Sequence, residues 1–297
     1  MNEQPTPLSV FSIDQLTNSV GTSEFHQFVG TGLIDHRGQA GLSAIAVLGE
    51  VIGGITFYES QPPGTPTVQA RVSLSAPSPV AVNSRLHGTG RVLGVSDGTA
   101  STFAEVKDER GTLVCAALGR SVVVGRPAAE MPHSVAYQSG TPRDRPPLPA
   151  PLPGGMSGAD VARGLADGTV AMGPIHDLLA LRIASIDGLA LDVRAAPPHT
   201  MANRMGSLHG GVLMAIVAES CSLAAELSAA PGRWHRITDI TLNYLRSPAL
   251  DAGDLAIMVR SIKTGQRISS LSATVTDAGG TLLAHAIADA AAAPSRT

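Results

Sequence analysis

The sequence predicts an α+β protein made of two similar halves, each with one long central helix wrapped by a curved antiparallel sheet. Residues 203–211 (NRMGSLHGG) are small, polar and Gly-rich, and lead into residues 212–221, an almost wholly apolar segment of helical length without Gly or Pro. Short segments rich in β-branched residues follow this helix. The apolar helical segment and the β-branched segments after it both recur earlier in the chain at a constant spacing. A helix that is apolar on every side is expected to be enclosed by other structure.

Composition excludes several classes of function. The chain has 297 residues, of which 43% are hydrophobic and 15% charged, with a formal net charge of -3. A core of good size is therefore expected, and nucleic acid is not an expected partner. Cys115 and Cys221 are too isolated to form a disulfide framework or a zinc site. No apolar run reaches the roughly 18 residues of a membrane span, and residues 1–7 lack the order of a signal peptide, so a cytoplasmic protein is expected.

Proline density divides the chain into three parts. Residues 1–126 form the predicted first half, residues 127–157 a Pro-rich linker, and residues 158–297 the second half. The first half contains one helical stretch, residues 41–57. The strands predicted in the second half are residues 184–193, with Asp187 and Gly188 at their centre, then residues 236–245, 254–262, 268–277 and 281–290.

An internal duplication relates the two halves. Aligned without gaps, matched residues lie 169 positions apart, and the pairs are Ala40 with His209, Glu50 with Glu219, Ser78-Pro79 with Ser247-Pro248, and Arg91 with Arg260. The turn sequence Asp-x-x-Gly-Thr-Leu occurs at residues 108–113 and again at residues 277–282. Turn residues are demanding of position, so this match favours a true duplication over a shared Ala- and Gly-rich composition.

The motif Asn-x-x-Gly-x-x-His-Gly-Gly at residues 203–211 resembles that of the hotdog-fold acyl-CoA thioesterases, in particular the phenylacetate-pathway (PaaI-like) type. The segment NYLRSP at residues 243–248, followed by Gly253 and Asp254, resembles the next strand of that family. The resemblance covers most of residues 160–293, and the first half shares it through its match to the second. It implies two tandem hotdog folds that pair within the chain, with their sheets joined and their helices side by side. It also implies a homo-oligomer of such chains.

The resemblance implies a thioester hydrolase that converts an acyl-CoA to a free acid and coenzyme A. Coenzyme A enters as part of the substrate, and no separate cofactor or metal is expected. Backbone N–H groups of Gly210 and Gly211, at a helix N-terminus, would hold the oxyanion. His209 would orient the loop or donate to the thioester, and Asn203 would position the water or the carboxylate. Arg246 is a candidate contact for a coenzyme A phosphate.

The candidate base or nucleophile is a carboxylate on a central helix, either Glu50 or Glu219, because buried carboxylates tend to have perturbed pKa values. Sites of this kind lie between two paired folds, so Glu50 is expected to face residues 203–211. One working and one vestigial site per chain follow from that pairing. In the family the carboxylate stands nine residues after the motif His, where this chain has Ala218 in the second half and Gly49 in the first.

Two further departures from the motif lie in the first half. Ala40-Gly41-Leu42 replaces His-Gly-Gly, and Ile34 stands where Asn203 is expected. These departures leave open a catalytically inactive protein that binds acyl-CoA or regulates through it. An enoyl-CoA hydratase is a third possibility that ranks lower, because no Asp-x4-His pair is present. Each motif residue also has a structural alternative: a helix entry for the glycines, a packed side chain for His209 and a turn former for Asn203.

Overall fold

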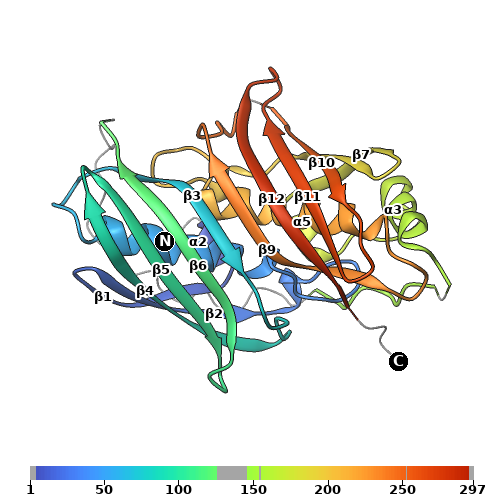
Figure 1. The fold of residues 1–297 in the computed structure, drawn as a ribbon, viewed down its shortest axis with the longest axis horizontal. Coiled ribbons are helices and arrows are strands. Elements are labelled where there is room, and N and C mark those ends of the chain that lie inside the picture. The colour runs from blue at the N-terminus through green and yellow to red at the C-terminus, as the bar shows by residue number, and fades with distance from the viewer. Residues whose placement is uncertain (1–4, 126–145, 154, 252, 294–297) are drawn as a thin grey trace.

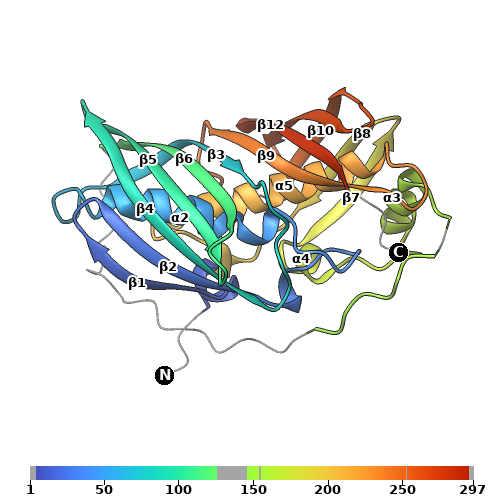
Figure 2. The same cartoon turned by 60° about the horizontal axis from the view of Figure 1, so that its bottom comes forward.

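In the part of the chain that the structure describes, twelve strands form one antiparallel sheet that curves around two central helices (Figures 1 and 2). The computed structural model describes residues 5–125, 146–153, 155–251 and 253–293. The strand order is β1-β2-β4-β5-β6-β3-β9-β12-β11-β10-β8-β7, so each half contributes one continuous block of six strands.

The first half begins with a short helix and a hairpin, continues into the central helix α2, and ends with a four-stranded run. Its elements are α1 (Pro7–Val10), β1 (Ile13–Ser19), β2 (Thr22–Val29), a 3₁₀ turn (Thr31–Leu33), α2 (Ser43–Tyr58), β3 (Thr67–Ser75), β4 (Ser84–Ser96), β5 (Thr99–Asp108) and β6 (Leu113–Val123).

The second half repeats this plan after one additional helix. Its elements are α3 (Gly158–Asp167), α4 (Pro174–Leu178), β7 (Leu181–Asp187), β8 (Ala190–Ala195), a 3₁₀ turn (His199–Met201), α5 (Gly210–Glu226), β9 (Trp234–Tyr244), β10 (Leu255–Lys263), β11 (Ile268–Thr276) and β12 (Leu282–Ala293). The predicted single strand at residues 184–193 is wrong. It is a hairpin of β7 and β8, because Gly188 adopts a positive φ of 56° and turns the chain.

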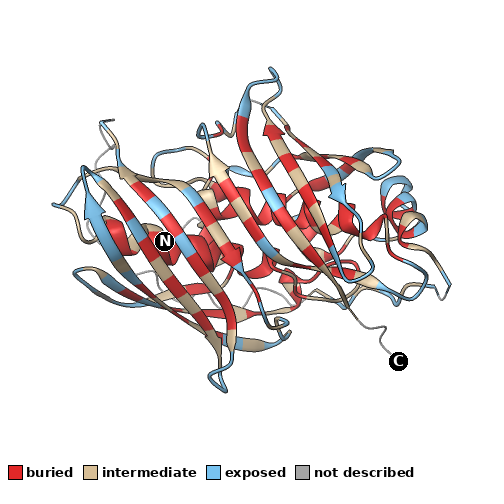
Figure 3. Cartoon of the chain, in the orientation of Figure 1, coloured by how far each residue is buried: buried red, intermediate tan, exposed pale blue. Residues whose placement is uncertain are grey.

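The two central helices account for most of the buried core. Most residues of α2 and α5 are buried on every side, as the expected enclosure requires (Figure 3). The strands have one buried face, and alternate residues point toward the helices. At the strands' inner face, Gly88 and Gly90 leave room for Ile52 of α2, since a Cβ at either glycine would lie 2.4 Å from an Ile52 side-chain atom.

The two halves join at the pair β3 and β9, which makes the sheet continuous. Five residue pairs define this antiparallel seam, with Ser73 opposite Thr241, and their hydroxyl oxygens lie 2.8 Å apart. Behind the seam α2 packs against α5 so closely that a Cβ at Gly211 would lie 2.7 Å from the Val47 Cα. The predicted pairing of the two folds within one chain is thus confirmed.

Of the predicted Pro-rich linker, residues 127–145 and 154 lie outside the described residues. Residues 146–153 run as extended chain without helix or strand, and Leu152 packs against the core. Helix α3 then begins at Gly158, after Ser157, whose side chain accepts the Asp160 N–H at 3.2 Å.

The two halves match at a spacing of 168 residues up to the seam, and not at 169. Residues 35–39 and 203–207 form the same loop. In each, the side chain of the first residue, Asp35 or Asn203, accepts the N–H groups of the residues two and four positions further on. The fourth residue of each loop is a glycine with positive φ, 71° and 78°. Asp35, and not Ile34, is therefore the counterpart of Asn203.

The strands at the seam show the same spacing. β3 and β9 each carry one extra residue that breaks the register with the neighbouring strand, Ala70 and Thr238, which lie 168 positions apart. From β4 and β10 onward the buried positions match at 169. A one-residue insertion between Tyr244 and Ser247 explains the change, and an alignment without gaps does not detect it.

Candidate active site

Glu50 projects from the middle of α2 toward the N-terminus of α5. Gln69 of β3 holds its carboxylate, because the Gln69 Nε2 donates to Glu50 Oε1 at 2.8 Å and to the Glu50 main-chain oxygen at 2.6 Å. The Glu50 side chain is 10% exposed, so it is largely removed from water without being sealed. The predicted approach of Glu50 to the motif of the other half is present in the structure.

His209 is the N-cap of α5 and lies next to the carboxylate. Its Nδ1 accepts the Gly211 N–H at 3.0 Å and lies 3.6 Å from Glu50 Oε2. Because Nδ1 is an acceptor here, the ring proton belongs on Nε2. Burial lowers the pKa of His209 to about 4, so the imidazole is neutral at pH 7.

Gly210 and Gly211 are required by space at the helix start. A Cβ at Gly210 would lie 2.6 Å from Glu50 Oε1, and one at Gly211 would lie 3.1 Å from Glu50 Oε2. Their lack of side chains lets the carboxylate approach the first N–H groups of α5, which have no acceptor within the helix.

Burial dominates the electrostatics of Glu50. It raises the pKa of Glu50 to about 7, although the hydrogen bonds from Gln69 and from the Gly211 N–H act in the opposite direction. No cation is among the causes of this shift. A carboxyl group with this pKa can both accept and release a proton near neutral pH.

Two other predicted residues have local roles in the structure. Asn203 uses its side chain within its own loop, since its amide nitrogen donates to Ser207 Oγ at 2.9 Å while its oxygen accepts two N–H groups. That geometry agrees with the turn former of the structural alternative. Arg246 is exposed and donates from Nη1 to the Leu282 carbonyl oxygen at 2.9 Å.

Glu219, the second predicted carboxylate, is not brought to the motif. Its Oε2 accepts the Ser43 hydroxyl at 2.6 Å, and its Oε1 lies 2.9 Å from His176 Nε2. The side chains of Glu219 and His176 are 2% and 0% exposed. Burial alone would raise the pKa of Glu219, but the neighbouring His176 holds it below its usual value. The same pairing raises the pKa of His176.

The Glu219 contacts belong to a larger buried ionic cluster between the halves. Arg37 donates from Nε to Asp35 at 2.8 Å, and its Nη1 lies 3.1 Å from Glu226 Oε2. His36 Nε2 approaches the same Glu226 oxygen at 3.1 Å. The two halves are thus bridged by charges that face each other away from water.

Helix α4 covers the buried pair of Glu219 and His176. The Ile175 N–H donates to the Ile34 oxygen at 3.0 Å, and Gly173 lies so close to the Asp35 and His36 backbone that a Cβ there would clash at 2.1 Å. This contact brings His176 onto Glu219. The corresponding short helix of the first half, α1, carries no histidine and packs on α1's own half, against β1 and α2.

The spacing of 168 changes the expected displacement of the carboxylates. With Asp35 opposite Asn203, Gly41 is the counterpart of His209, and Glu50 stands nine residues after it. Glu50 therefore occupies the position that the family resemblance assigns to the carboxylate, and the expected one-residue displacement of Glu50 is wrong. Glu219 alone is displaced. One residue turns a helical side chain by about 100°, which accounts for its different partners.

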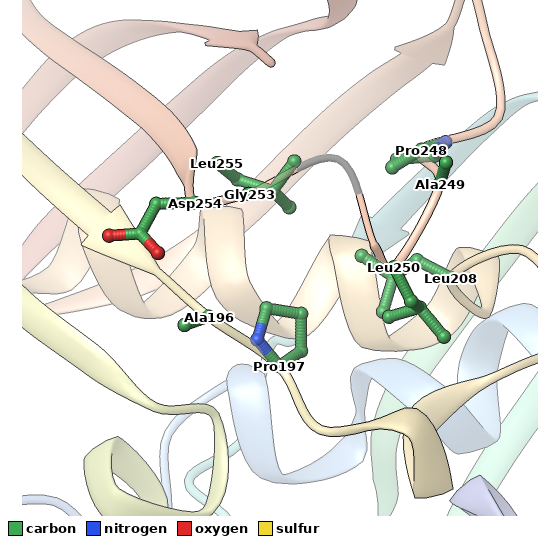
Figure 4. Close-up of a pocket in the computed structure, with 9 residues that line it drawn as sticks. All are labelled: Ala196, Pro197, Leu208, Pro248, Ala249, Leu250, Gly253, Asp254 and Leu255. Atoms are coloured by element: carbon green, nitrogen blue, oxygen red, sulfur yellow. The ribbon is translucent and has the colours of Figure 1, made fainter. Parts of the chain in front are cut away.

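A surface pocket of about 130 Å³ lies against the motif loop (Figure 4). Leu208, the residue before His209, forms part of its wall, and apart from Asp254 its lining is apolar or glycine. The other lining residues are Ala196, Pro197, Pro248, Ala249, Leu250, Gly253 and Leu255. Within the described ranges no group of three or more His, Cys, Asp or Glu is arranged to hold a metal ion. None of the helices in those ranges is long and apolar enough to cross a membrane.

Three contacts of the two carboxylates escaped prediction from the sequence. Gln69 is one of several polar residues on a strand, and no spacing distinguishes it. Ser43 follows the altered motif and looks like an ordinary helix start. His176 stands alone between apolar segments, and only the position of α4 brings it to Glu219.

Comparison with known proteins agrees with this architecture. Residues 198–291 match the family model of the acyl-CoA thioesterase N-terminal domain. No curated protein matches the sequence.

Solved structures cover nearly the whole chain. The tesB protein of Mycobacterium avium subs paratuberculosis superimposes with a TM-score of 0.61 at 11% identity, covering 97% of this chain and 98% of its own. A hot dog fold protein of unknown function from Alicyclobacillus acidocaldarius gives 0.60 at 12% identity, with the same coverage of 97% and 98%. A putative thioesterase from Novosphingobium aromaticivorans gives 0.59 at 16% identity, covering 94% and 98%. These likenesses establish the fold. The chain is therefore a double hotdog protein, and its residues 198–291 match the family model of the acyl-CoA thioesterase N-terminal domain.

Proposed function

We propose that the chain hydrolyses an acyl-CoA thioester at a single site formed by Glu50 of the first half and residues 203–211 of the second. The observation that carries this proposal is the position of Glu50. It lies against the N-terminus of α5, partly open to water, with a pKa of about 7. A base with this pKa is suited to accept a proton at neutral pH.

In the proposed reaction, Glu50 removes a proton from a water molecule as the water oxygen attacks the thioester carbonyl carbon. The carbonyl oxygen becomes an oxyanion and is stabilised by N–H groups at the start of α5. The Gly211 N–H, given to His209 Nδ1 in this structure, would be shared with that oxygen. The intermediate collapses by breaking the carbon–sulfur bond, and the proton held by Glu50 passes to the departing thiolate. The products are the carboxylic acid and coenzyme A.

The supporting residues have distinct proposed roles. Gln69 fixes the direction of the carboxylate through its bond to Oε1. His209, neutral at pH 7, caps α5 and adds no charge beside Glu50. Arg246 is a proposed contact for a coenzyme A phosphate, since its guanidinium is exposed two residues beyond Tyr244, which lies at the site.

A direct test uses the purified chain, a panel of acyl-CoAs of different length and aromatic content, and a reagent that detects free thiol. Release of coenzyme A with at least one acyl-CoA is the expected result. Binding of acyl-CoAs without any release would overturn the proposal in favour of an acyl-CoA-binding protein. Release of a hydrated product without free thiol would instead indicate a hydratase.

A second test separates Glu50 as base from Glu50 as nucleophile. Under single turnover in ¹⁸O-labelled water, a general base leaves the label only in the released acid. A carboxylate nucleophile would form an anhydride, and attack of water on the Glu50 carbonyl of that anhydride would leave ¹⁸O in the Glu50 side chain, detectable by peptide mass spectrometry. We expect label in the product alone.

A further inference from the structure

Tyr244, the last residue of β9, contacts the first residue of α5. Its hydroxyl donates to the Gly210 carbonyl oxygen at 3.0 Å. Its ring lies beside the same residue, with Cε1 3.7 Å from the point a Gly210 Cβ would occupy. Burial, and then the charge of Glu50, raise the pKa of Tyr244 well above its ordinary value, so the hydroxyl stays protonated and can donate at neutral pH.

The carbonyl that Tyr244 holds belongs to the same peptide group as the Gly211 N–H. In a planar trans peptide the C=O and N–H bonds point in opposite directions. A hydroxyl that fixes the Gly210 oxygen on one edge therefore fixes the direction of the Gly211 N–H on the other edge. That N–H points to His209 Nδ1 at 3.0 Å and also lowers the pKa of Glu50.

We propose that Tyr244 is a positioning residue that fixes the Gly210–Gly211 peptide and thereby the N–H donor shared by Glu50 and the thioester oxygen. The proposal rests on the proposed thioester hydrolysis for its effect on rate, and on the geometry alone for its effect on Glu50. Tyr244 itself touches neither the reacting atoms nor the carboxylate through a hydrogen bond of its own, since its hydroxyl is directed to Gly210.

The other half lacks this device. At the spacing of 168 that relates β3 to β9, Ala76 is the counterpart of Tyr244. Leu42 and Ser43 are the counterparts of Gly210 and Gly211, and there the Ser43 hydroxyl, in place of a backbone N–H, donates to the helix carboxylate. The tyrosine thus occurs only where the helix start approaches the carboxylate with backbone atoms alone.

The test compares Tyr244→Phe, which keeps the ring and removes the hydroxyl, with Tyr58→Phe as the matched control. Tyr58 is a half-buried tyrosine at the far end of α2. In Tyr244→Phe we expect kcat to fall about 10-fold with little change in KM, less than the loss of an entire oxyanion donor. The acid limb of the pH profile should move to higher pH, because a weakened Gly211 bond favours protonated Glu50. Tyr58→Phe should match the wild type in both.

A measurement independent of turnover keeps the proposal falsifiable. The pKa of Glu50 is read by NMR titration of side-chain ¹³C-labelled glutamate, with its signal identified through Glu50→Gln. A higher Glu50 pKa in Tyr244→Phe than in the wild type is expected. An unchanged Glu50 pKa overturns the proposal, whether or not the wild type hydrolyses acyl-CoA. If the pKa rises while no acyl-CoA is hydrolysed, the positioning role stands and the proposed function fails.

Discussion

Glu50 and Glu219 are both carboxylates in apolar central helices, yet their surroundings differ in every respect that matters for chemistry. Glu50 faces a helix start built of two glycines, keeps 10% of its side chain exposed and has a raised pKa. Glu219 faces a serine hydroxyl and a histidine, is 2% exposed and has a lowered pKa. Ionised Glu50 accepts hydrogen bonds but has no cation beside it among the described residues. Glu219 has His176 beside it, which keeps the carboxylate ionised.

The comparison shows how a duplicated fold can separate reactivity from stability. A carboxylate that must take up protons needs burial without a cation beside it, which disfavours its charged form. Glu219, which lies beside His176, has a lowered pKa and therefore stays ionised at neutral pH. The one-residue difference in helical position, together with α4, gives Glu219 the second environment.

The sharpest test of this contrast is the pair Glu50→Gln and Glu219→Gln, each assayed for hydrolysis and checked for folding by circular dichroism. Glu50→Gln is expected to lose at least about 100-fold in kcat, because the amide cannot accept the proton. Glu219→Gln should keep kcat within about 3-fold, as the charge it removes acts far from the reacting atoms. Equal activity in Glu50→Gln and the wild type would contradict the assignment. Loss confined to Glu219→Gln would place the site at the other helix.

For stability the expected order of the two substitutions is reversed, and Glu219→Gln has the larger destabilising effect. Glu219→Gln leaves His176 buried without its carboxylate, and breaking a buried ion pair in this way costs about 3 kcal/mol of unfolding free energy. Urea unfolding at pH 7 with an unchanged m-value measures this loss. His176→Gln combined with Glu219→Gln should cost less than the two single changes added together, because they share one interaction. Full additivity would show that the pair is not coupled.

Space at the helix start can be tested with Gly211→Ala and the matched control Gly94→Ala. A Cβ at Gly211 would meet the Val47 backbone at 2.7 Å, whereas nothing lies within 4 Å of one at Gly94. We expect Gly211→Ala to force α2 and α5 apart, to lose about 1–3 kcal/mol of stability as overpacked cores do, and to reduce kcat by roughly 10-fold through the displaced carboxylate. Gly94→Ala should change neither quantity. Wild-type kinetics in Gly211→Ala would mean that the helices accommodate the added methyl group without displacing Glu50.

A further expected effect is a difference in how stability depends on pH. Glu50 has a pKa of about 7 in the folded chain against 4.5 for the ordinary group. The folded state therefore keeps this proton up to a higher pH than the unfolded state does. The resulting stabilisation is present below pH 4.5 and is lost as the pH rises to about 7. It amounts to at most about 3 kcal/mol. Glu50→Gln should accordingly gain stability relative to the wild type across that interval.

Glu219 is expected to show the opposite sign. Its pKa is lowered in the folded chain, so its contribution is present above its ordinary value of 4.5 and lost as the pH falls through the folded pKa. The stability difference between the wild type and Glu219→Gln should narrow in acid, in urea titrations repeated from pH 7 to pH 3. Parallel pH curves for the two variants would contradict the distinction between the carboxylates.

Local patterns predict much of this fold. The apolar segments without proline become α2 and α5, and the strands of the meander begin and end within a few residues of their predicted ends. The glycines and His209 predict the candidate site, because their requirements are local to the helix start. The approach of Glu50 followed from pairing the two halves, a rule of the architecture and not of the residues themselves.

The missed features depend on contacts or spacing that local pattern does not record. The pattern of residues 184–193 predicts one strand because apolar residues alternate on both sides of Gly188, where the chain in fact turns. The insertion after Tyr244 shifts the two halves by one residue, and an ungapped comparison therefore assigned Ile34 and Gly49 to positions that Asp35 and Glu50 occupy. His176, the partner of Glu219, lies on a five-residue helix, which is too short for a periodic pattern to predict.

The seam of β3 and β9 affects how the protein responds to dilution and how mutations can change its two halves. Since both strands belong to one polypeptide, their meeting is intramolecular and does not depend on protein concentration. An assembly of two identical chains would come apart at low concentration, and any mutation would appear in both of its sites at once. Here one gene encodes two different partners, so a substitution such as the displaced Glu219 changes one position and leaves the other as it was. Because the two halves are joined, every copy of the protein carries this asymmetry.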